Sequence, residues 1–322
     1  MKNRLRLALI VASSVLCVTA AMAQSFPGKP LHIVVPFTAG GTADVLARLV
    51  GQKMSDALGQ QVLVENRPGG GTVIGTEYTA RAPADGHTML VMANSFTINP
   101  AVRDKLPYDP VKDFAPITLL VKSPQVLVLG PTTQVKSLAE FIALVKSRPG
   151  KMSLATVGPA TTQHVASEML KGVMKLEMIY VPYPGGAPAA TALVGGHVDA
   201  VLANYSEVAA HIQSGKARAI AVTSLERTDT LKDVPTVSES GFPGFEAAAW
   251  FGLVATGGSP PAAIARLNAE ANKALKLPDV REKLIAQAMY PVGTTPEQFG
   301  AHIRSEMTNY AKVIKEAGIK VD

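Results

Sequence analysis

Short extended runs of apolar residues alternate with amphipathic helical patterns along most of this chain, and no other feature of the sequence constrains the fold as strongly. The runs that we expect to form strands are 31–35, 62–65, 88–92, 117–121, 126–129, 153–156, 178–181, 200–203, 217–222 and 251–255. Helices are expected between them at 44–58, 73–81, 137–148, 161–173, 187–194 and 207–214. Regular alternation of this kind predicts mainly parallel sheets with helices on both faces, which is the α/β class.

The segment 252–322 departs from this pattern because it is almost entirely helical. Helices are expected at 260–275, 279–287 and 296–317, each with proline at or near its first turn, and only 289–292 has an extended pattern. A helical tail without a sheet of its own needs an existing core to pack on. We therefore expect it to return to the sheet formed by the N-terminal part of the chain.

The length of 322 residues exceeds what one hydrophobic core usually fills, so two lobes are expected. The first lobe would comprise 24–122 together with 252–322, and the second lobe 123–251. The chain would then cross between the lobes near 120–123 and 250–252. Two crossings between two α/β lobes form a hinge around a cleft.

The N-terminus has the layout of a secretory signal peptide. Lys2, Arg4 and Arg6 precede an apolar stretch at 7–20, and Ala21-Met22-Ala23 follows it. The apolar stretch is shorter than the roughly 20 residues that span a bilayer. We expect residues 1–23 to be removed by cleavage after Ala23, which places the mature protein in the periplasm.

A membrane-anchored lipoprotein is the alternative, because Cys17 lies within the same stretch. Leu16 precedes it, whereas the residue before a lipidated cysteine is normally small. Cys17 is also the sole cysteine of the chain. Once it leaves with the signal peptide, the mature chain has no disulfides and no thiolate chemistry.

The charge of the chain argues against nucleic-acid binding. The formal net charge of +6 falls to +3 once Lys2, Arg4 and Arg6 are removed, and the remaining bases are interleaved with acids. Aromatic residues make up only 5%, whereas a nucleic-acid binder clusters basic and aromatic side chains.

A glycine-rich turn, Ala39-Gly40-Gly41-Thr42-Ala43-Asp44, joins the first expected strand to the first expected helix. Such a turn aims unpaired backbone N–H groups at one point, and the helix dipole adds positive potential there. No lysine or arginine lies between His32 and Arg48, so phosphate chemistry is not indicated. The turn predicts a small anion held by the main chain. The alternative, a glycine connection that only lets strand and helix pack, stays open.

Loops at the ends of other expected strands are candidates for the same cleft, because ligands of open α/β sheets bind beyond the carboxyl ends of the strands. These loops lie at 93–95, 157–164, 182–187 and 204–206, and their residues are small, glycine-bearing or neutral and polar. We therefore expect an uncharged cleft wall. Asp44 is expected to hydrogen-bond the first turn of its helix rather than contact a ligand.

Other chemistry is weakly indicated. The run Gly69-Gly70-Gly71-Thr72-Val73-Ile74-Gly75 lacks the spacing of a dinucleotide fingerprint, and Pro68 precedes it. The six histidines show no metal-ligand spacing, and His164 is expected to stabilise its loop. No serine stands in a G-x-S-x-G turn. We expect no metal, no cofactor and no enzymatic activity.

Sequence pieces along nearly the whole mature chain resemble the exported solute receptors of tripartite tricarboxylate transporters, the Bug family. The matching pieces include 30–37, Ala39-Gly40-Gly41 with Asp44, Val64-Glu65-Asn66-Arg67-Pro68-Gly69, Ala84-Asp85-Gly86-His87-Thr88, Leu106-Pro107-Tyr108-Asp109-Pro110, Asp113-Phe114-Ala115-Pro116, Val181-Pro182-Tyr183, Ala187-Pro188-Ala189, Asp233-Val234-Pro235-Thr236, Trp250-Phe251-Gly252-Leu253 and Pro291-Val292-Gly293. The resemblance implies a type II periplasmic-binding-protein-like Venus flytrap, which closes on a small carboxylate and delivers it to membrane permease subunits, and which we expect to be a monomer.

Carried over by position, the resemblance implies ligand contacts at the following residues: Phe37, Ala39, Gly40, Gly41, Thr42, Asn94 and Ser95 in the first lobe, and Gly158, Thr161, Thr162, Tyr183, Gly186, Ala187 and Asn204 in the second. The chain departs from the family pattern at Pro159-Ala160, where relatives tend to have a glycine, and at Ala203-Asn204, where an acid–Asn pair is frequent. Citrate-like acids, dicarboxylates, amino acids and aromatic acids all remain open as ligands. Two other functions also remain open, a ligand-sensing receptor for a membrane signalling protein and a secreted hydrolase.

Overall fold

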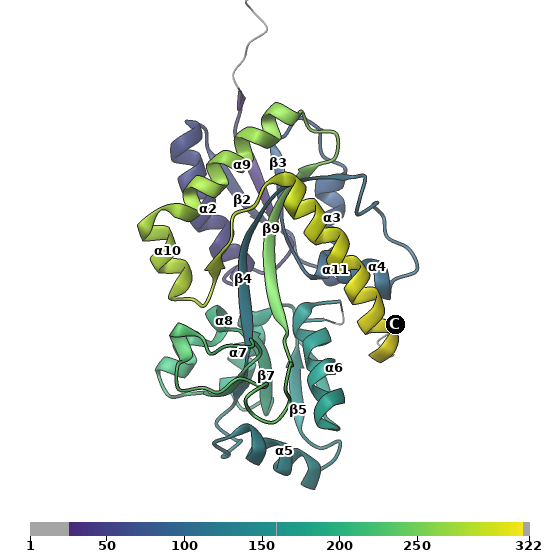
Figure 1. The fold of residues 1–322 in the computed structure, drawn as a ribbon, viewed down its shortest axis with the longest axis vertical. Coiled ribbons are helices and arrows are strands. Elements are labelled where there is room, and N and C mark those ends of the chain that lie inside the picture. Colours follow the sequence, from purple (N-terminus) through teal and green to yellow (C-terminus); the bar gives the residue numbers. More distant parts are fainter. Residues whose placement is uncertain (1–25, 159, 318–322) are drawn as a thin grey trace, which may run out of the picture.

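The computed structural model describes residues 26–158 and 160–317, so the expected signal peptide and Pro159 lie outside the described residues. Two α/β lobes are stacked end to end and are joined by the long strands β4 (Phe114–Leu129) and β9 (Ala248–Thr256) (Figure 1). Among the described residues, no helix combines the length and the apolar character needed to cross a membrane.

The sheet of the first lobe has the order β2 (Val62–Asn66), β1 (Leu31–Val35), β3 (Thr88–Ala93), β9 and the first part of β4, with β10 (Tyr290–Pro291) also paired with β4. In the second lobe, β4 pairs with β8 (Arg218–Val222) and β7 (Ala200–Asn204), and β5 (Ser153–Thr156) and β6 (Ile179–Pro182) follow.

The α/β class is confirmed, but the pairing of the sheets is mixed. Strand β1 runs parallel to β2 and β3, and β5 runs parallel to β6 and β7. Strands β4 and β9 run antiparallel to each other and to their other partners. The reason is that the chain leaves the first lobe along β4 and returns along β9, so the two crossing strands must point in opposite directions.

Strand β4 is continuous where the sequence predicts two strands with a break between them. It pairs with β9 as far as Pro124, opposite Ala248, and with β7 from Gln125, opposite Asn204. Lys122, Ser123 and Pro124 are typical of a loop. They remain in the strand because its pairing partner changes there, which makes β4 a member of both sheets.

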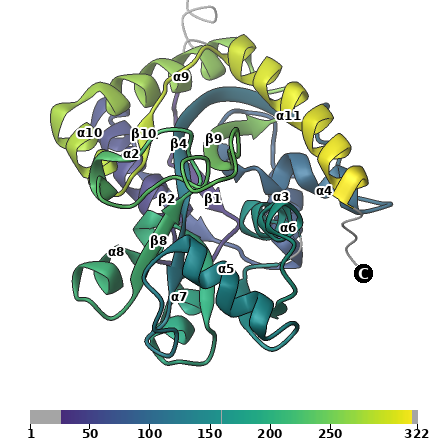
Figure 2. The ribbon, with the colours of Figure 1, turned by 60° about the horizontal axis from the view of Figure 1, so that its bottom comes forward.

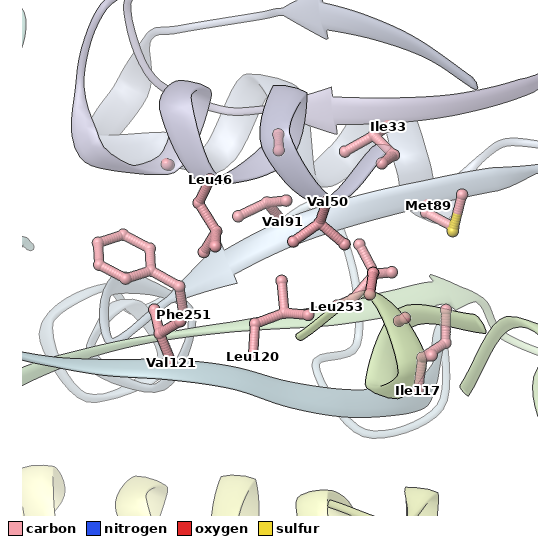
Figure 3. Close-up of a cluster of buried hydrophobic side chains, with 14 of the residues drawn as sticks. Ile33, Leu46, Val50, Met89, Val91, Ile117, Leu120, Val121, Phe251 and Leu253 are labelled. Carbon is pink, nitrogen blue, oxygen red and sulfur yellow. The ribbon is translucent and has the colours of Figure 1, made fainter. Parts of the chain in front are cut away.

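Helices cover both faces of the first sheet. Helices α2 (Thr42–Leu58), α9 (Pro261–Lys276) and α10 (Pro278–Ile285) lie on one face, where Leu46 and Val50 of α2 pack on Val91 and Leu253 (Figure 3). Helices α3 (Val73–Ala80), α4 (Ser95–Val102) and α11 (Pro296–Ala317) lie on the other. The sequence did not predict α4, because Pro100 disfavours the interior of a helix.

The second sheet is covered in the same way, by α5 (Leu138–Ser147) and α6 (Thr162–Met174) on one face and by α7 (Gly186–Val194) and α8 (Tyr205–Gln213) on the other. Two short 3₁₀ turns, η1 (Gly70–Thr72) and η2 (Asp229–Leu231), complete the described elements.

The helical C-terminal tail packs on the first lobe, as expected. Helix α11 lies along α4 at the side of the molecule (Figure 2). Its later turns also reach the second lobe, since Ile314 shares a small apolar cluster with Ile98 of α4 and Val165 of α6.

Candidate functional site

A cavity of about 40 Å³ lies between the two lobes. The first lobe lines it with Phe37, Thr38, Gly41, Thr42, Ala43, Ala93 and Ser95, and the second with Val157, Thr161, Thr162, Gln163, Pro184, Gly185, Gly186, Asn204 and Glu207. The crossing strand β9 adds Ala249 and Phe251. A larger groove of about 350 Å³ lies between α6 and α11, but the strand-end turns of β1 and β6 do not line it. The cavity is therefore the site that both sets of strand-end turns share.

Five helices begin at this cavity. Their starts are Gly41–Ala43 for α2, Ser95 for α4, Thr161–Gln163 for α6, Gly185–Gly186 for α7 and Asn204 for α8. The first N–H groups of a helix have no acceptor within the helix, and the helix dipole makes this end positive. In the part of the chain that the structure describes, no lysine or arginine lines the cavity. The site therefore offers main-chain donors to an anion without a basic side chain.

The two lobes touch across the cavity. The Thr42 hydroxyl on α2 lies 2.7 Å from the Ser206 hydroxyl on α8, and it donates to Glu207 Oε1 over 3.2 Å. A second contact joins the lobes nearby, where Gly185 lies so close to Thr38 that a Cβ at this position would overlap the threonine hydroxyl. The conformation is therefore closed.

The sequence predicts an uncharged cleft wall, and this prediction is wrong because Glu207 lines the cavity. The sequence predicts that a helix starts at 207, whereas α8 starts at Tyr205, so Glu207 falls in the first turn and lines the cavity. Its Oε2 accepts from the Asn204 N–H over 3.2 Å and from Gln163 Nε2 over 3.4 Å, and its Oε1 accepts from Asn204 Nδ2 over 3.3 Å. Burial raises the pKa of the Glu207 carboxyl, and these hydrogen bonds oppose the shift. The spacing of Asn204 and Glu207, which is that of a capping box, is the signal that could have revealed this.

The structure brings eight of the fourteen predicted contact residues together at the cavity. They are Phe37, Gly41, Thr42, Ser95, Thr161, Thr162, Gly186 and Asn204. Ala39, Gly40, Asn94, Gly158, Tyr183 and Ala187 are not among its lining residues. Ligand contact stays a prediction for the whole set.

Several of these six residues use their backbone groups in hydrogen bonds within the protein. The Gly40 N–H donates to Asp44 Oδ2, the Gly158 carbonyl accepts from the Thr161 hydroxyl over 2.8 Å, and the Tyr183 N–H donates to the Thr156 carbonyl over 2.7 Å. These groups stabilise the turns rather than face the cavity.

Asn94 is fully buried and joins three elements of the first lobe. Its Nδ2 donates to the Tyr310 hydroxyl over 2.7 Å and to the Ala248 carbonyl over 3.2 Å. Its Oδ1 accepts from the Trp250 N–H over 2.9 Å. Both polar atoms of the side chain thus join the start of α4 to β9 and α11, which is the ordinary structural role of a buried asparagine.

The cavity is also lined by ten residues that are not among the fourteen predicted contacts. These are Thr38, Ala43, Ala93, Val157, Gln163, Pro184, Gly185, Glu207, Ala249 and Phe251. Several of them are neighbours of predicted residues within the same turns. Ala249 and Phe251 have a different origin, because β9 passes under the cavity as it crosses between the lobes.

Asp44 stabilises the glycine-rich turn through hydrogen bonds. It is buried, and its carboxylate accepts from the Gly40 N–H over 3.0 Å, from Asn66 Nδ2 over 3.0 Å and from Arg48. Burial alone would raise the pKa of this carboxyl, but the hydrogen bonds from Arg48, Gly40 and Asn66 outweigh it and hold the pKa below its usual value. Asp44 does not line the cavity, in keeping with the structural role expected for it.

Replacing Asp44 with asparagine should lower the free energy of unfolding by about 1–3 kcal/mol at about pH 7. We expect the lower part of this range, because solvent screens the half-exposed Arg48. The pKa of Asp44 is lower in the folded state, so its contribution is present above the unfolded-state pKa and is lost as pH falls through the folded-state pKa. Denaturant unfolding should therefore show a smaller difference at about pH 3. Asp56→Asn, on the exposed side of the same helix, is the control. If Asp44→Asn lowered the free energy of unfolding equally at both pH values, the stabilising role assigned to the ionised Asp44 would be contradicted.

The other sequence motifs lie away from the cavity. His164 Nδ1 is 3.2 Å from the Thr156 hydroxyl and its ring packs on Tyr180, while burial lowers its pKa. The run 69–75 forms η1 and the start of α3, where the Gly71 carbonyl accepts from Asn99 Nδ2. Neither His164 nor this run lines the cavity.

Two α/β lobes that close over a cavity bounded by helix N-termini define a solute-binding receptor. The sequence matches the model of the tripartite tricarboxylate transporter family receptor over residues 46–319, and the chain belongs to this family. Its members are periplasmic solute-binding receptors and not enzymes, which excludes the secreted hydrolase.

Individual relatives agree with this assignment. Protein BugT of Bordetella pertussis is 36% identical over 93% of this chain and 92% of its own length. The structure of the periplasmic binding protein BugD has a TM-score of 0.88 and 34% identity over 92% of this chain and 99% of its own. A structure of R. palustris Rpa4515 with adipate has a TM-score of 0.89 and 32% identity over 92% of this chain and 99% of its own.

Proposed function

We propose that this protein captures a small carboxylate-containing metabolite in the periplasm and delivers it to the membrane subunits of a tripartite tricarboxylate-type transporter. The ligand carboxylate would accept hydrogen bonds from backbone N–H and hydroxyl groups of both lobes. One observation carries the proposal: five helices begin at a closed interlobe cavity, and no lysine or arginine of residues 26–158 and 160–317 lines it. The adipate held by the R. palustris relative supports the same ligand class.

The energetics explain why both lobes would be needed. Taking a carboxylate out of water costs several kcal/mol, which hydrogen bonds must offset when no counter-ion is present. Each hydrogen bond to a charged group contributes about 1.5–3 kcal/mol, and a helix N-terminus adds about 1 kcal/mol at most sites. Three or four such bonds with burial of the carbon skeleton reach micromolar affinity, about −8 kcal/mol. One lobe alone offers too few donors, so the ligand would stabilise the closed state.

We assign the hinge to the two crossing strands. The pairing of β4 passes from β9 to β7 between Pro124 and Gln125, and β9 begins at Ala248. The proposed division into 24–122 with 252–322 and 123–251 cuts both strands within a few residues of this change. Opening would then bend β4 and β9 and break the contact of Thr42 with Ser206.

Gly41→Val tests the proposed site. Gly41 has φ −80° and ψ 171°, which valine adopts without strain, and there is room for a Cβ, but the added methyl groups would fill the cavity. Thermal-shift screening of the wild type against carboxylic acids should find stabilising ligands, and Gly41→Val should lose this stabilisation while its ligand-free melting temperature stays nearly unchanged. Gly172→Val, at an open position on α6, is the matched control. Normal ligand affinity in Gly41→Val would exclude this cavity as the binding site.

A further inference from the structure

Among the described residues that line the cavity, Glu207 is the sole charged one. A cavity bounded by helix N-termini suits an anion, and a fixed carboxylate within it repels one. The capping-box bond from the Asn204 N–H explains why the first turn of α8 carries an acid. It does not explain why this acid also lies against Thr42 of the opposite lobe, at the point where the lobes meet.

Glu207 accepts hydrogen bonds, but none of its donors among the described residues is a positively charged group. Its donors are Thr42, Gln163 and Asn204, which are all neutral, and their four bonds measure 3.2–3.4 Å. Bonds of this length from neutral groups are weaker than the charge-assisted bonds of an ion pair. Glu207 is partly buried, and a cation would stabilise its carboxylate, but the described residues that line the cavity supply none.

The cavity thus combines two opposite chemistries. The starts of α2, α4, α6 and α7 offer N–H donors, and Glu207 at the start of α8 offers a carboxylate acceptor. A simple dicarboxylate satisfies the donors but places a further negative charge beside Glu207. A ligand that carries both a carboxylate and an ammonium group satisfies both sides.

We propose that the ligand is an amino acid, whose carboxylate binds the helix N-termini and whose ammonium group pairs with Glu207. This inference rests on the proposed function and narrows its ligand class. It also assigns Glu207 as a specificity-determining residue, because an ion pair with the ligand is available only to the compounds that carry the amine.

Matched ligand pairs test the inference on the full mature protein. Aspartate and succinate, glutamate and glutarate, and alanine and propionate share their carbon skeletons and differ in the ammonium group. Isothermal titration calorimetry at neutral pH should show that the preferred amino acid binds about 10- to 100-fold more tightly than its amine-free partner. Glu207→Gln keeps an oxygen acceptor for the Asn204 N–H, and it should remove most of this difference by weakening the amino acid alone. Glu226→Gln, at an exposed position of the second lobe, should change neither affinity.

The outcomes separate this inference from the proposed function. An amine-free acid could bind as tightly as its amino-acid partner, or Glu207→Gln could weaken the binding of both equally. Either result would keep the proposed carboxylate receptor and would contradict the ion pair between Glu207 and the ligand. Tighter binding of a dicarboxylate by wild type than by Glu207→Gln would show instead that Glu207 is protonated and donates to the ligand. If no compound of either kind binds, the proposed function fails together with the inference.

Discussion

Gly185→Val should reduce ligand affinity by about 100-fold or more while the protein still folds, because it keeps the lobes from closing. Gly185 has φ 176° and ψ 172°, an extended conformation that valine adopts readily. A side chain at this position would overlap Thr38, which belongs to the opposite lobe. The substitution therefore acts on the closed state and leaves the core of each lobe unchanged. Tryptophan fluorescence or calorimetry with the best ligand from the screen would measure the loss.

A pair of smaller substitutions provides the control for this prediction. Gly185→Ala adds only the Cβ, and Thr38→Ala removes the hydroxyl and the methyl group that it would meet. Gly185→Ala should weaken binding, and the double variant Thr38→Ala/Gly185→Ala should recover part of the affinity. Wild-type affinity in Gly185→Val would mean that binding does not require the approach of Thr38 and Gly185.

Phe299→Ala should cause the largest loss of stability, about 3–5 kcal/mol in the free energy of unfolding. Phe299 on α11 is fully buried, and its ring lies 6.0 Å from that of Trp250 in an edge-to-face arrangement. It also covers Gly252 of β9, where a Cβ would overlap the ring. At this point a large side chain of the C-terminal helix packs directly on the backbone of a strand that has no side chain there. Denaturant unfolding measures the loss.

Phe299→Leu is the matched variant for this prediction. It keeps an apolar side chain over Gly252, so it should cost clearly less than the alanine variant. Phe299 does not line the cavity, so ligand affinity of the folded protein should be unchanged. A loss below about 1 kcal/mol for Phe299→Ala would show that α11 contributes little to the first lobe.

Most of the fold could be predicted from the sequence because it depends on local patterns. The strands at 31–35 and 153–156 have the bounds that their apolar runs predict, and the helix at 296–317 has the bounds of its amphipathic pattern. The exceptions depend on distant parts of the chain. The polar residues near Pro124 predict a turn, and only their pairing with β9 and β7 keeps β4 continuous.

The site could be predicted only in part, for a related reason. Glycine turns at strand ends and the apolar patterns beside them are local, and they located the starts of α2, α6 and α7. Closure of the lobes is not local. It brings Thr38 to Gly185 and Thr42 to Glu207, and no spacing in the sequence encodes these contacts. Asn94 follows a strand, as expected, but its side chain is used in hydrogen bonds to β9 and α11, which no local pattern predicts.

A crystal structure of the complex with the tightest-binding carboxylate tests the central claim most directly. The ligand carboxylate should accept hydrogen bonds from backbone N–H groups of both lobes, at the starts of α2 and α6, with no lysine or arginine in contact with it. A basic side chain paired with the carboxylate, or a ligand bound outside the interlobe cavity, would contradict the claim.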